Sequence, residues 1–290
     1  MKKIDIIGAC SDFGVHLDGA KFGPVELEKN IDKTIVNSVT NIECNNTKKE
    51  LEKENLQKNL NEVNNYNQKL YTHILTSVAD NHLPLVLGGD HSIAIATALA
   101  SIKKHNNLGI IWFDAHGDFN TFETTSSGNI HGLPFAVLCN YEKKYLTAFH
   151  NGPFYNPKNA VLVGARDIDK PGELDNLKKA GITIFTTEDI KELGIDYVYS
   201  KAFEIASNGT NGIHISYDLD VIDPDIAPGV SIPAANGISL KEAYDFVNYI
   251  VNNKGKIKSI DLVEFNPLKD KANSTKKIAE NILNKLIKDL

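Results

Sequence analysis

The chain has 290 residues, of which 42% are hydrophobic and 23% charged, and its formal net charge at pH 7 is −6. This composition is typical of globular proteins and excludes fibrous, collagen-like and fully disordered chains. No apolar run approaches the ~18 residues of a membrane-spanning helix. The negative net charge also disfavours nucleic-acid binding, because such binding relies on clustered Lys and Arg that neutralise phosphates. We therefore expect a soluble protein with neither nucleic-acid nor membrane partners.

The three cysteines, Cys10, Cys44 and Cys139, lie far apart and form no CxxC pair. Such a set is neither a disulfide framework nor a zinc site, and it favours reduced thiols. The apolar segment within the first ten residues is shorter than that of a secretory leader, and it contains Asp5. The sequence therefore predicts a cytoplasmic protein.

In chain order, apolar β-rich runs alternate with helical patterns. The predicted strands are Ile4–Gly8, Leu83–Gly88, Leu108–Asp114, Ala160–Ala165, Ile182–Thr186, Ile213–Asp218 and Ile257–Val263. The predicted helices are Gln57–Asp80, Ser92–His105, Glu173–Lys179, Ser239–Asn253 and Ser274–Lys288. Several strands are apolar throughout, as expected when helices cover both faces of a sheet. We expect one α/β domain over residues 1–290, with three α-β-α layers and a mainly parallel sheet.

Two further features are structural rather than chemical. The stretch Asn41–Gln68 is rich in Asn, Lys and Glu and is interpreted as a surface loop followed by a solvated helix. Arg166 is the only arginine among 31 basic residues. A planar guanidinium with several donors can fill a role that an ammonium cannot, so we expect Arg166 to anchor its loop.

Acidic and histidine side chains gather where three predicted strands end. The segments are Gly88-Gly89-Asp90-His91-Ser92, Asp114-Ala115-His116-Gly117-Asp118 and Asp218-Leu219-Asp220. Residues two apart on an extended chain point the same way, and ligands of open α/β sheets bind beyond the carboxyl ends of the strands. The candidate ligands are His91, Asp114, His116, Asp118, Asp218 and Asp220.

Four neighbouring carboxylates cannot all stay ionised without a counter-charge. Carboxylate and imidazole ligands without a thiolate suit Mn²⁺, Zn²⁺ or Fe²⁺. Six ligands are too many for one catalytic ion and fit two, which can share a hydroxide nucleophile. The sequence therefore predicts a two-metal hydrolytic site.

These three segments, together with Glu264-Phe265-Asn266-Pro267, resemble the motif set of the ureohydrolases in order and spacing. The resemblance extends from Gly8 to the final helix. Within that family, Asp118-Phe119-Asn120-Thr121 and the stretch from Thr125 to Gly132 resemble arginases, whereas agmatinases have a different loop there.

The resemblance implies a central eight-stranded sheet and two Mn²⁺ ions per subunit. One ion would be held by His91, Asp114, Asp118 and Asp218, and the other by His116, Asp114, Asp218 and Asp220. It further implies that a metal-bridging hydroxide attacks the guanidinium carbon of L-arginine, which yields L-ornithine and urea. A homo-oligomer, trimer or hexamer, is implied as well.

Other residues have candidate roles around the metals. Glu264 could pair with the guanidinium, and His131, in a Gly-flanked loop, could pass a proton to the leaving amine. The resemblance implies that Asn120, Ser127 and Asn129 contact the α-carboxylate, although Asn129 could equally serve a turn. It also implies that Asp169 contacts the α-ammonium, with Glu173 acting through water. The remaining histidines, expected to be structural or surface groups without partners, are His16, His73, His82, His105, His150 and His214.

The segment Gly229-Val230-Ser231-Ile232-Pro233 departs from the family pattern, because Ile232 stands where arginases have a threonine near the guanidinium. This departure leaves two alternatives open. One is a ureohydrolase for another guanidino compound, such as agmatine or guanidinobutyrate. The other is a non-catalytic homologue that binds metal or guanidino compounds. For a catalyst, we expect an alkaline activity optimum.

Overall fold

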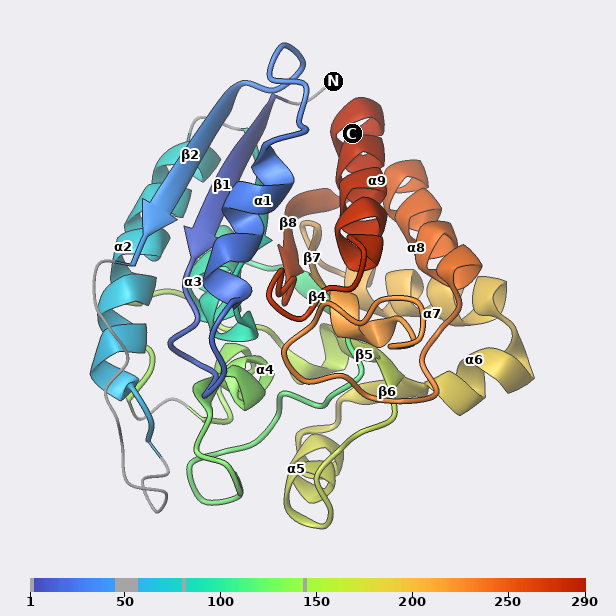
Figure 1. Cartoon of the computed structure of the whole chain (residues 1–290). Coiled ribbons are helices and arrows are strands. Elements are labelled where there is room, and N and C mark those ends of the chain that lie inside the picture. The colour runs from blue at the N-terminus through green and yellow to red at the C-terminus, as the bar shows by residue number, and fades with distance from the viewer. Residues whose placement is uncertain (1–2, 45–56, 80–81, 143–144) are drawn as a thin grey trace.

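The structure is a computed structural model that describes residues 3–44, 57–79, 82–142 and 145–290. Eight strands form one sheet in the order β2-β1-β3-β8-β7-β4-β5-β6, and every neighbouring pair is parallel (Figure 1). The strands are β1 (Ile4–Cys10), β2 (Ser38–Glu43), β3 (Leu83–Gly88), β4 (Gly109–Phe113), β5 (Ala160–Ala165), β6 (Thr183–Thr186), β7 (Ile213–Asp218) and β8 (Ile257–Val263). The predicted α/β fold with an eight-stranded parallel sheet is confirmed.

Helices cover both faces of this sheet. They are α1 (Gly23–Glu28), α2 (Leu60–Ala79), α3 (Ala94–His105), α4 (Pro134–Leu138), α5 (Gly172–Ala180), α6 (Thr187–Leu193), α7 (Ile195–Ser207), α8 (Leu240–Asn252) and α9 (Ser274–Asp289). In Figure 1, α1 and α9 lie in front of the sheet and α2 and α3 behind it. Among the described residues, none of the helices has the length and apolar character to cross a membrane.

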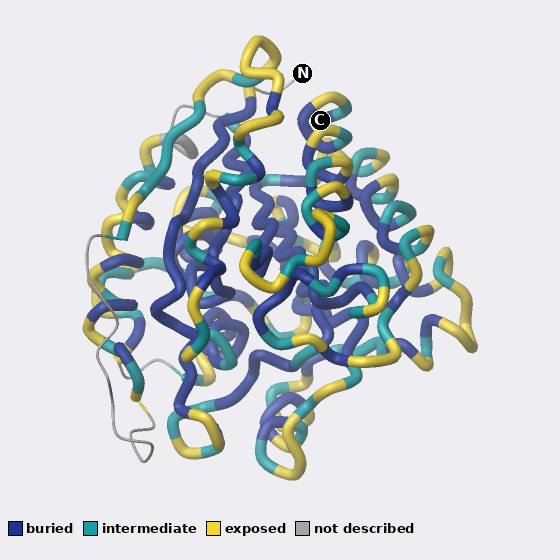
Figure 2. Tube along the Cα trace, viewed as in Figure 1, coloured by how far each residue is buried: buried dark blue, intermediate teal, exposed yellow. Residues whose placement is uncertain are grey.

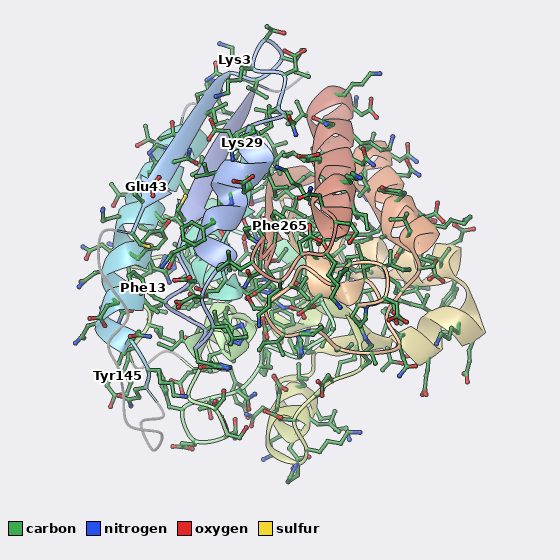
Figure 3. The ribbon with its side chains drawn as sticks, in the orientation of Figure 1. Lys3, Phe13, Lys29, Glu43, Tyr145 and Phe265 are labelled. Atoms are coloured by element: carbon green, nitrogen blue, oxygen red, sulfur yellow. The ribbon has the colours of Figure 1, made fainter. Side chains whose placement is uncertain are left out.

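The core is divided into two layers by the sheet, because successive strand residues point to opposite faces. On β4, Ile110 and Trp112 join the cluster under α2, α3 and α4, whereas Ile111 and Phe113 join the cluster under α7, α8 and α9. All four side chains are fully buried. Figure 2 shows the inner strands in dark blue, the edge strand β2 mainly in teal, and exposed faces on the outside of the helices. Of the residues labelled in Figure 3, Lys3, Lys29 and Glu43 are exposed, whereas Phe265 is buried.

The sheet order brings together strand ends that are distant in sequence. The four strands β3, β8, β7 and β4 are consecutive neighbours in the sheet. They are also the strands followed by the acidic and histidine segments and by Glu264. Because all of them run in the same direction, these segments emerge at one edge of the sheet.

One strand was not predicted, and one helix was misjudged. Ser38–Glu43 forms the edge strand β2 instead of belonging partly to a loop, and its polar, half-exposed residues gave no apolar run. Helix α2 is not merely solvated, because its Val63, Leu70 and Ile74 are buried. Residues 45–56 of the predicted loop, and Asp80 at the predicted end of the helix, lie outside the described residues.

The helices α1, α4, α6 and α7 were also not predicted. The first two are short, with 6 and 5 residues, and each begins with a proline at one of its first two positions, where the missing N–H costs little. The longer α7 buries Val198, Ala202 and Phe203 on one face. Its aromatic and β-branched residues have weak helix propensity, so packing against the sheet decides its structure.

Candidate active site

A turn after β3 presents His91. Asp90 caps this turn, because its Oδ1 accepts a hydrogen bond from the Ser92 N–H at 2.9 Å. Its other oxygen, Oδ2, accepts a hydrogen bond from the Gly14 N–H at 3.0 Å. Burial raises the pKa of Asp90 to about 6, and the nearby charge of Glu264 contributes. Asp90 therefore fixes the loop around His91.

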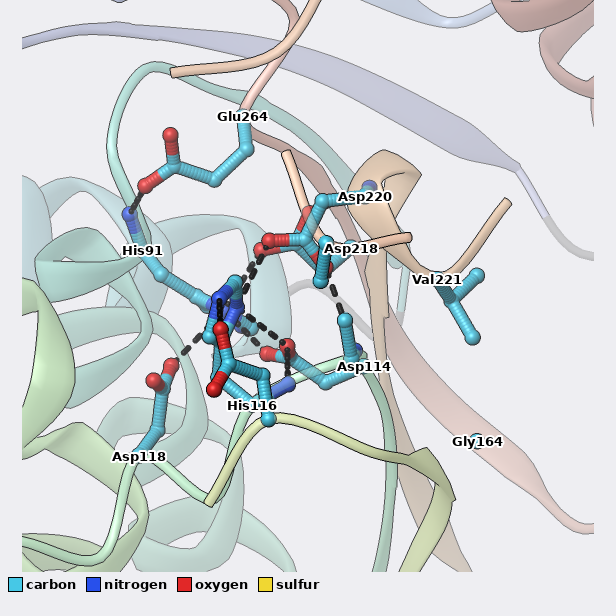
Figure 4. Close-up of polar contacts among 12 residues, drawn as sticks. His91, Asp114, His116, Asp118, Gly164, Asp218, Asp220, Val221 and Glu264 are labelled. Carbon is cyan, nitrogen blue, oxygen red and sulfur yellow. Dashed lines mark hydrogen bonds and ion pairs between the residues drawn. The ribbon is translucent and has the colours of Figure 1, made fainter. Parts of the chain in front are cut away.

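Three carboxylates converge on the ring of His91 (Figure 4). From Nδ1 of His91, the distance to Oδ2 is 3.0 Å for Asp114 and 3.1 Å for both Asp118 and Asp218. A ring nitrogen can donate only one hydrogen bond, so three acceptors around it exceed what a proton can satisfy. A cation fits this surplus of acceptors.

A second group shares Asp114 with the first. His116 Nδ1 lies 2.9 Å from Asp220 Oδ2 and 3.5 Å from Asp114 Oδ1. The ligand atoms of His91, Asp114 and Asp218, and those of Asp114, His116 and Asp220, form two clusters in which all atoms lie within 4.8 Å of one another. Asp114 thus presents one oxygen to each cluster. Among the described residues, Asp218 belongs only to the cluster of His91 and Asp114 and not to that of His116, so its bridging role stays a prediction.

The rings and carboxylates are held by their neighbours. The His91 ring stacks on Trp112 with centroids 4.0 Å apart, and the Trp112 indole N–H donates to Asp114 Oδ2 at 3.0 Å. His91 Nε2 lies 2.8 Å from Ser216 Oγ. A hydrogen bond from Nε2 to this hydroxyl leaves the Nδ1 lone pair directed at the carboxylates, as metal ligation requires.

The electrostatics of the site also fit cations. Burial raises the pKa of Asp118 to about 6 and that of Asp218 well above its usual range, and the charge of Asp114 contributes to both. Burial would lower the pKa of His91, but its carboxylate neighbours raise it well above the usual value. Raised pKa values in closely spaced carboxyl groups indicate that the site lacks a compensating positive charge. The donor set of carboxylates and imidazoles, without a thiolate, fits two hard divalent ions.

Two of the acidic residues adopt a left-handed backbone. The φ angle is 46° for Asp118 and 65° for Glu264, a region that costs non-glycine residues about 1–3 kcal/mol. The surrounding packing enforces both, since each residue is buried. The strain places both carboxylates at the carboxyl edge of the sheet.

Glu264 and His131 form a buried pair beside His91. Glu264 Oε1 accepts a hydrogen bond from the His91 main-chain N–H at 2.9 Å and lies 3.1 Å from His131 Nδ1. Burial would raise the pKa of Glu264, but His131 holds it below its usual value. Conversely, burial would lower the pKa of His131, but Glu264 raises it. The two residues therefore favour the charged form of each other, a carboxylate beside a protonated imidazole. Glu264 Oε2 is buried and accepts no hydrogen bond from the described residues.

One pocket joins this centre to the predicted substrate residues. Its lining includes His116, Asp118, Asp218 and Asp220 from the candidate metal centre, and Asn120, Ser127, Asn129, His131, Asp169 and Glu173 from the loops. Asn120 Nδ2 donates to Asp169 Oδ2 at 3.2 Å. Glu173 accepts hydrogen bonds from the main-chain N–H groups of Phe119 and Asp169, at 2.8 and 3.0 Å, so it also holds two loops together.

Other pocket residues were not singled out from the sequence. These residues are His16, Thr125, Ser126 and Asp167. Ile232, which the sequence had singled out, also forms part of the pocket wall. The hydroxyl of Ser231 instead accepts a hydrogen bond from Asn266 Nδ2 at 3.3 Å. Thr125 and Ser126 lie inside the recognised loop and could have been proposed from it. His16 carried no motif.

The expectation that the remaining histidines lack partners was wrong. His16 Nδ1 lies 2.9 Å from Asn129 Nδ2, and His82 Nδ1 lies 2.6 Å from Asp5 Oδ2. The fully buried His214 lies 2.6 Å from Ser259 Oγ and 3.2 Å from an Asp261 oxygen. Sequence alone gave no signal for these contacts, because each joins segments at least 45 residues apart.

Arg166 is a structural anchor, as predicted. Its guanidinium donates hydrogen bonds to the main-chain carbonyls of Gly164, Asp220, Val221, Ala234 and Ala235. The planar fork thereby ties the end of β5 to the segment after β7. A lysine has one nitrogen atom and could not reach this set.

The fold and the site define a class of α/β proteins with a paired carboxylate–histidine centre at the carboxyl edge of a parallel sheet. The family model described as "Arginase family" matches residues 2–288. An arginase from Staphylococcus aureus (strain MSSA476) is 39% identical over 297 residues, which cover 97% of this chain and 96% of that protein.

Two solved structures show the same architecture. The native arginase from Bacillus caldovelox superimposes with a TM-score of 0.92 at 33% identity and covers 99% of this chain and 98% of its own. An Entamoeba histolytica arginase in complex with L-ornithine has a TM-score of 0.89 at 33% identity and covers 98% of each chain. The chain belongs to the arginase family. It is thus an arginase-type hydrolase that acts on carbon–nitrogen bonds of guanidino groups.

Proposed function

We propose that this protein hydrolyses L-arginine to L-ornithine and urea with two Mn²⁺ ions. The first ion would be held by His91, Asp114, Asp118 and Asp218, and the second by His116, Asp114, Asp218 and Asp220. When bound, the two ions would supply a hydroxide nucleophile between them, because they lower the pKa of a bridging water. The six side chains are also the strongest candidates on chemical grounds, since they supply only carboxylate and imidazole ligands.

One observation carries the choice of substrate. The pocket that is lined by four of the six candidate metal ligands is also lined by Asn120, Ser127 and Asn129, together with Asp169 and Glu173. Neutral donors suit a carboxylate and acidic groups suit an ammonium, so the two sets match the two ends of an α-amino acid head. A guanidinium would then point inward to the centre. The E. histolytica arginase that shares this fold was solved with L-ornithine, an amino acid with the same head group.

Glu264 is placed to hold the guanidinium. Its Oε1 is occupied by His91 and His131, whereas Oε2 is buried and accepts no hydrogen bond from the described residues. A buried carboxylate oxygen of this kind fits an N–H of a cationic guanidinium. We assign Glu264 to orient the guanidinium carbon toward the metal centre.

His131 is placed to deliver a proton. Attack on the guanidinium carbon forms a carbon–oxygen bond, and urea leaves when the bond from carbon to the side-chain nitrogen breaks. The departing nitrogen needs a proton to leave as the ornithine amine. His131 lines the pocket, and Glu264 raises its pKa, which favours the protonated form that can supply this proton.

A second candidate is a ureohydrolase for a different guanidino compound. Ile232 contributes an apolar side chain to the pocket wall, where the family pattern has a threonine hydroxyl. A lost hydrogen bond to a charged group is worth about 1.5–3 kcal/mol, or roughly ten- to a hundredfold in rate. This difference could favour a substrate other than L-arginine.

Urea release decides between these functions. The manganese-loaded protein is assayed with L-arginine, agmatine and guanidinobutyrate side by side, and Glu264→Gln serves as the low-activity control. Urea from L-arginine in preference to the others is expected. Equal or better turnover of agmatine would assign a different substrate. No urea from any of the three, with manganese demonstrably bound, would instead indicate a non-catalytic homologue.

We also propose that residues 1–290 form one domain that acts in the cytoplasm as a homo-oligomer, a trimer or a hexamer. The family match over residues 2–288 supports a single domain, and three free cysteines suit a reducing compartment. The number of subunits is measured by light scattering coupled to size-exclusion chromatography.

A further inference from the structure

The pocket has an uneven distribution of charge around the predicted head-group site. Asp167, Asp169 and Glu173 supply acidic groups, whereas no described Lys or Arg lines the pocket. An α-carboxylate must therefore be bound by hydroxyls, amides or imidazoles. Besides His116 and His131, which belong to the catalytic centre, the only imidazole among the described lining residues is that of His16.

His16 is carried by a rigid loop that follows β1. Two residues earlier, Gly14 donates its N–H to Asp90 Oδ2 at 3.0 Å, and its carbonyl accepts the N–H of His131 at 3.0 Å. A Cβ at position 14 would lie 2.3 Å from Asp90 Oδ1 and 2.7 Å from Ser92 Cβ, so a larger residue would displace these two buried side chains. The loop is thus fixed to both sides of the catalytic centre, and His16 reaches the pocket from a defined position.

The contact made by His16 determines what Asn129 can offer to a ligand. Nδ1 of His16 lies 2.9 Å from Nδ2 of Asn129, while Oδ1 of Asn129 is buried and has no hydrogen-bond partner among the described residues. In the structure, the amide N–H₂ of Asn129 faces His16, and the remaining group is the buried acceptor Oδ1. If His16 instead carries its proton on Nδ1 and donates to Oδ1, the amide is turned over and the remaining group is the N–H₂ donor.

We propose that His16 is a specificity-determining positioning residue, which turns the Asn129 amide so that its N–H₂ group donates to the α-carboxylate of the substrate. This inference rests on the proposed function, because it takes Asn129 to contact the amino-acid head. A carboxylate accepts hydrogen bonds and cannot donate one, so it binds only the orientation in which Oδ1 of Asn129 faces an Nδ1–H of His16. A decarboxylated substrate such as agmatine has no carboxylate and does not require this orientation of the amide. His16 therefore favours substrates with a carboxylate and has little effect on the reacting guanidinium.

Kinetics of two variants test this role. In His16→Ala, we expect KM for L-arginine to rise about tenfold with kcat nearly unchanged, whereas KM for agmatine stays the same. His16→Asn keeps a short side chain that can donate a hydrogen bond and should recover much of the loss. His73→Ala, which removes a histidine of α2 that does not line the pocket, is the matched control. Equal changes in KM for both substrates, or no change for either, would overturn the proposal.

Binding and spectroscopy test the same step without turnover. Calorimetry of the manganese-loaded protein should show that His16→Ala weakens the binding of L-ornithine about tenfold more than the binding of putrescine, its decarboxylated analogue. In ¹⁵N spectra of histidine-labelled protein, assigned with the His16→Ala variant, L-ornithine should increase the Nδ1–H tautomer of His16 and putrescine should not. An unchanged tautomer, or no binding of L-ornithine, would refute the role of His16.

These measurements separate the two proposals. If the wild-type protein releases no urea from L-arginine, the proposed function fails, and the L-ornithine and putrescine comparison still decides the role of His16. If urea is released but the variants show no carboxylate-dependent effect, only the role of His16 fails.

Discussion

Nδ1 of His131 lies 3.1 Å from Oε1 of Glu264, and the two residues shift each other's pKa in opposite directions. The pair connects a loop after β4 with the end of β8. Its two members are therefore a fixed anion that can hold a cationic substrate and a fixed acid that can protonate a leaving group. Removing the charge of one residue should shift the pKa of the other residue.

Glu264→Gln keeps the shape of the side chain but removes its charge. We expect kcat/KM for L-arginine to fall by roughly a hundredfold or more, because the interaction with a cationic group is lost. The pKa of His131, followed by NMR, should also fall, since its carboxylate partner is gone. An unchanged pKa of His131 would contradict the pairing, and a circular dichroism spectrum like that of the wild type controls for folding.

Substitution of Asp114 and of Asp118 should remove different numbers of bound metal ions. Asp114 belongs to both ligand clusters, whereas Asp118 lies only beside His91. We expect Asp114→Asn to bind close to no manganese after dialysis and Asp118→Asn to retain about one ion of two. Elemental analysis measures the ratio, and the exposed Asp225→Asn is the control. Equal losses in both site variants would argue against a shared Asp114.

Manganese should stabilise the protein more strongly as pH rises. In the metal-free site, burial raises the pKa of Asp118 to about 6, and carboxylates raise the pKa of His91 above its usual value. Both side chains must lose protons before they can bind a metal ion, so acid competes with manganese. The increase in Tm on adding Mn²⁺ should therefore grow from about pH 5 to about pH 8. An increase that shrinks with pH would contradict this assignment of ligands.

Asp5 links the edge strand to the sheet and should matter in acid. Hydrogen bonds from Ser38, Asn37 and His82 lower its pKa despite burial. A lowered folded pKa means that the ionised form stabilises the fold above the unfolded value near ~3.9, and this contribution is lost as pH falls through the folded pKa. Asp5→Asn should cost about 1–3 kcal/mol in urea unfolding at neutral pH. The difference from wild type should shrink below about pH 4, and a constant difference would refute the charge-based account.

Arg166→Lys should destabilise the protein although it preserves the charge. The guanidinium of Arg166 donates to five main-chain carbonyls, and an ammonium cannot reproduce that planar arrangement. We expect a loss of about 2 kcal/mol or more in the free energy of unfolding. Lys103→Arg, at an exposed position of α3, is the reverse control and should change little. A variant as stable as the wild type would show that the carbonyls find other partners.

The sequence predicted the parts of the molecule in which local pattern decides structure. The buried strands are apolar on both faces, and Asp114, His116 and Asp118 follow one of them at a spacing of two residues, so their place at the site could be predicted. The extended backbone expected for this segment was wrong at Asp118, whose φ angle is 46°. The edge strand β2 could not, because a strand with one neighbour and a half-exposed surface needs no apolar run. The contact between His16 and Asn129 could not either, since it depends on two loops 113 residues apart meeting in space.

The contiguity of β3, β8, β7 and β4 has a consequence for how the protein folds. The ligands of the candidate centre extend from His91 to Asp220, and Glu264 joins them from the last strand. No short segment of the chain carries a complete set, so a metal ion finds its full coordination only after long-range strand pairing is finished. Metal binding should consequently slow unfolding far more than it accelerates refolding. The bound ions should therefore increase the kinetic stability of the native state.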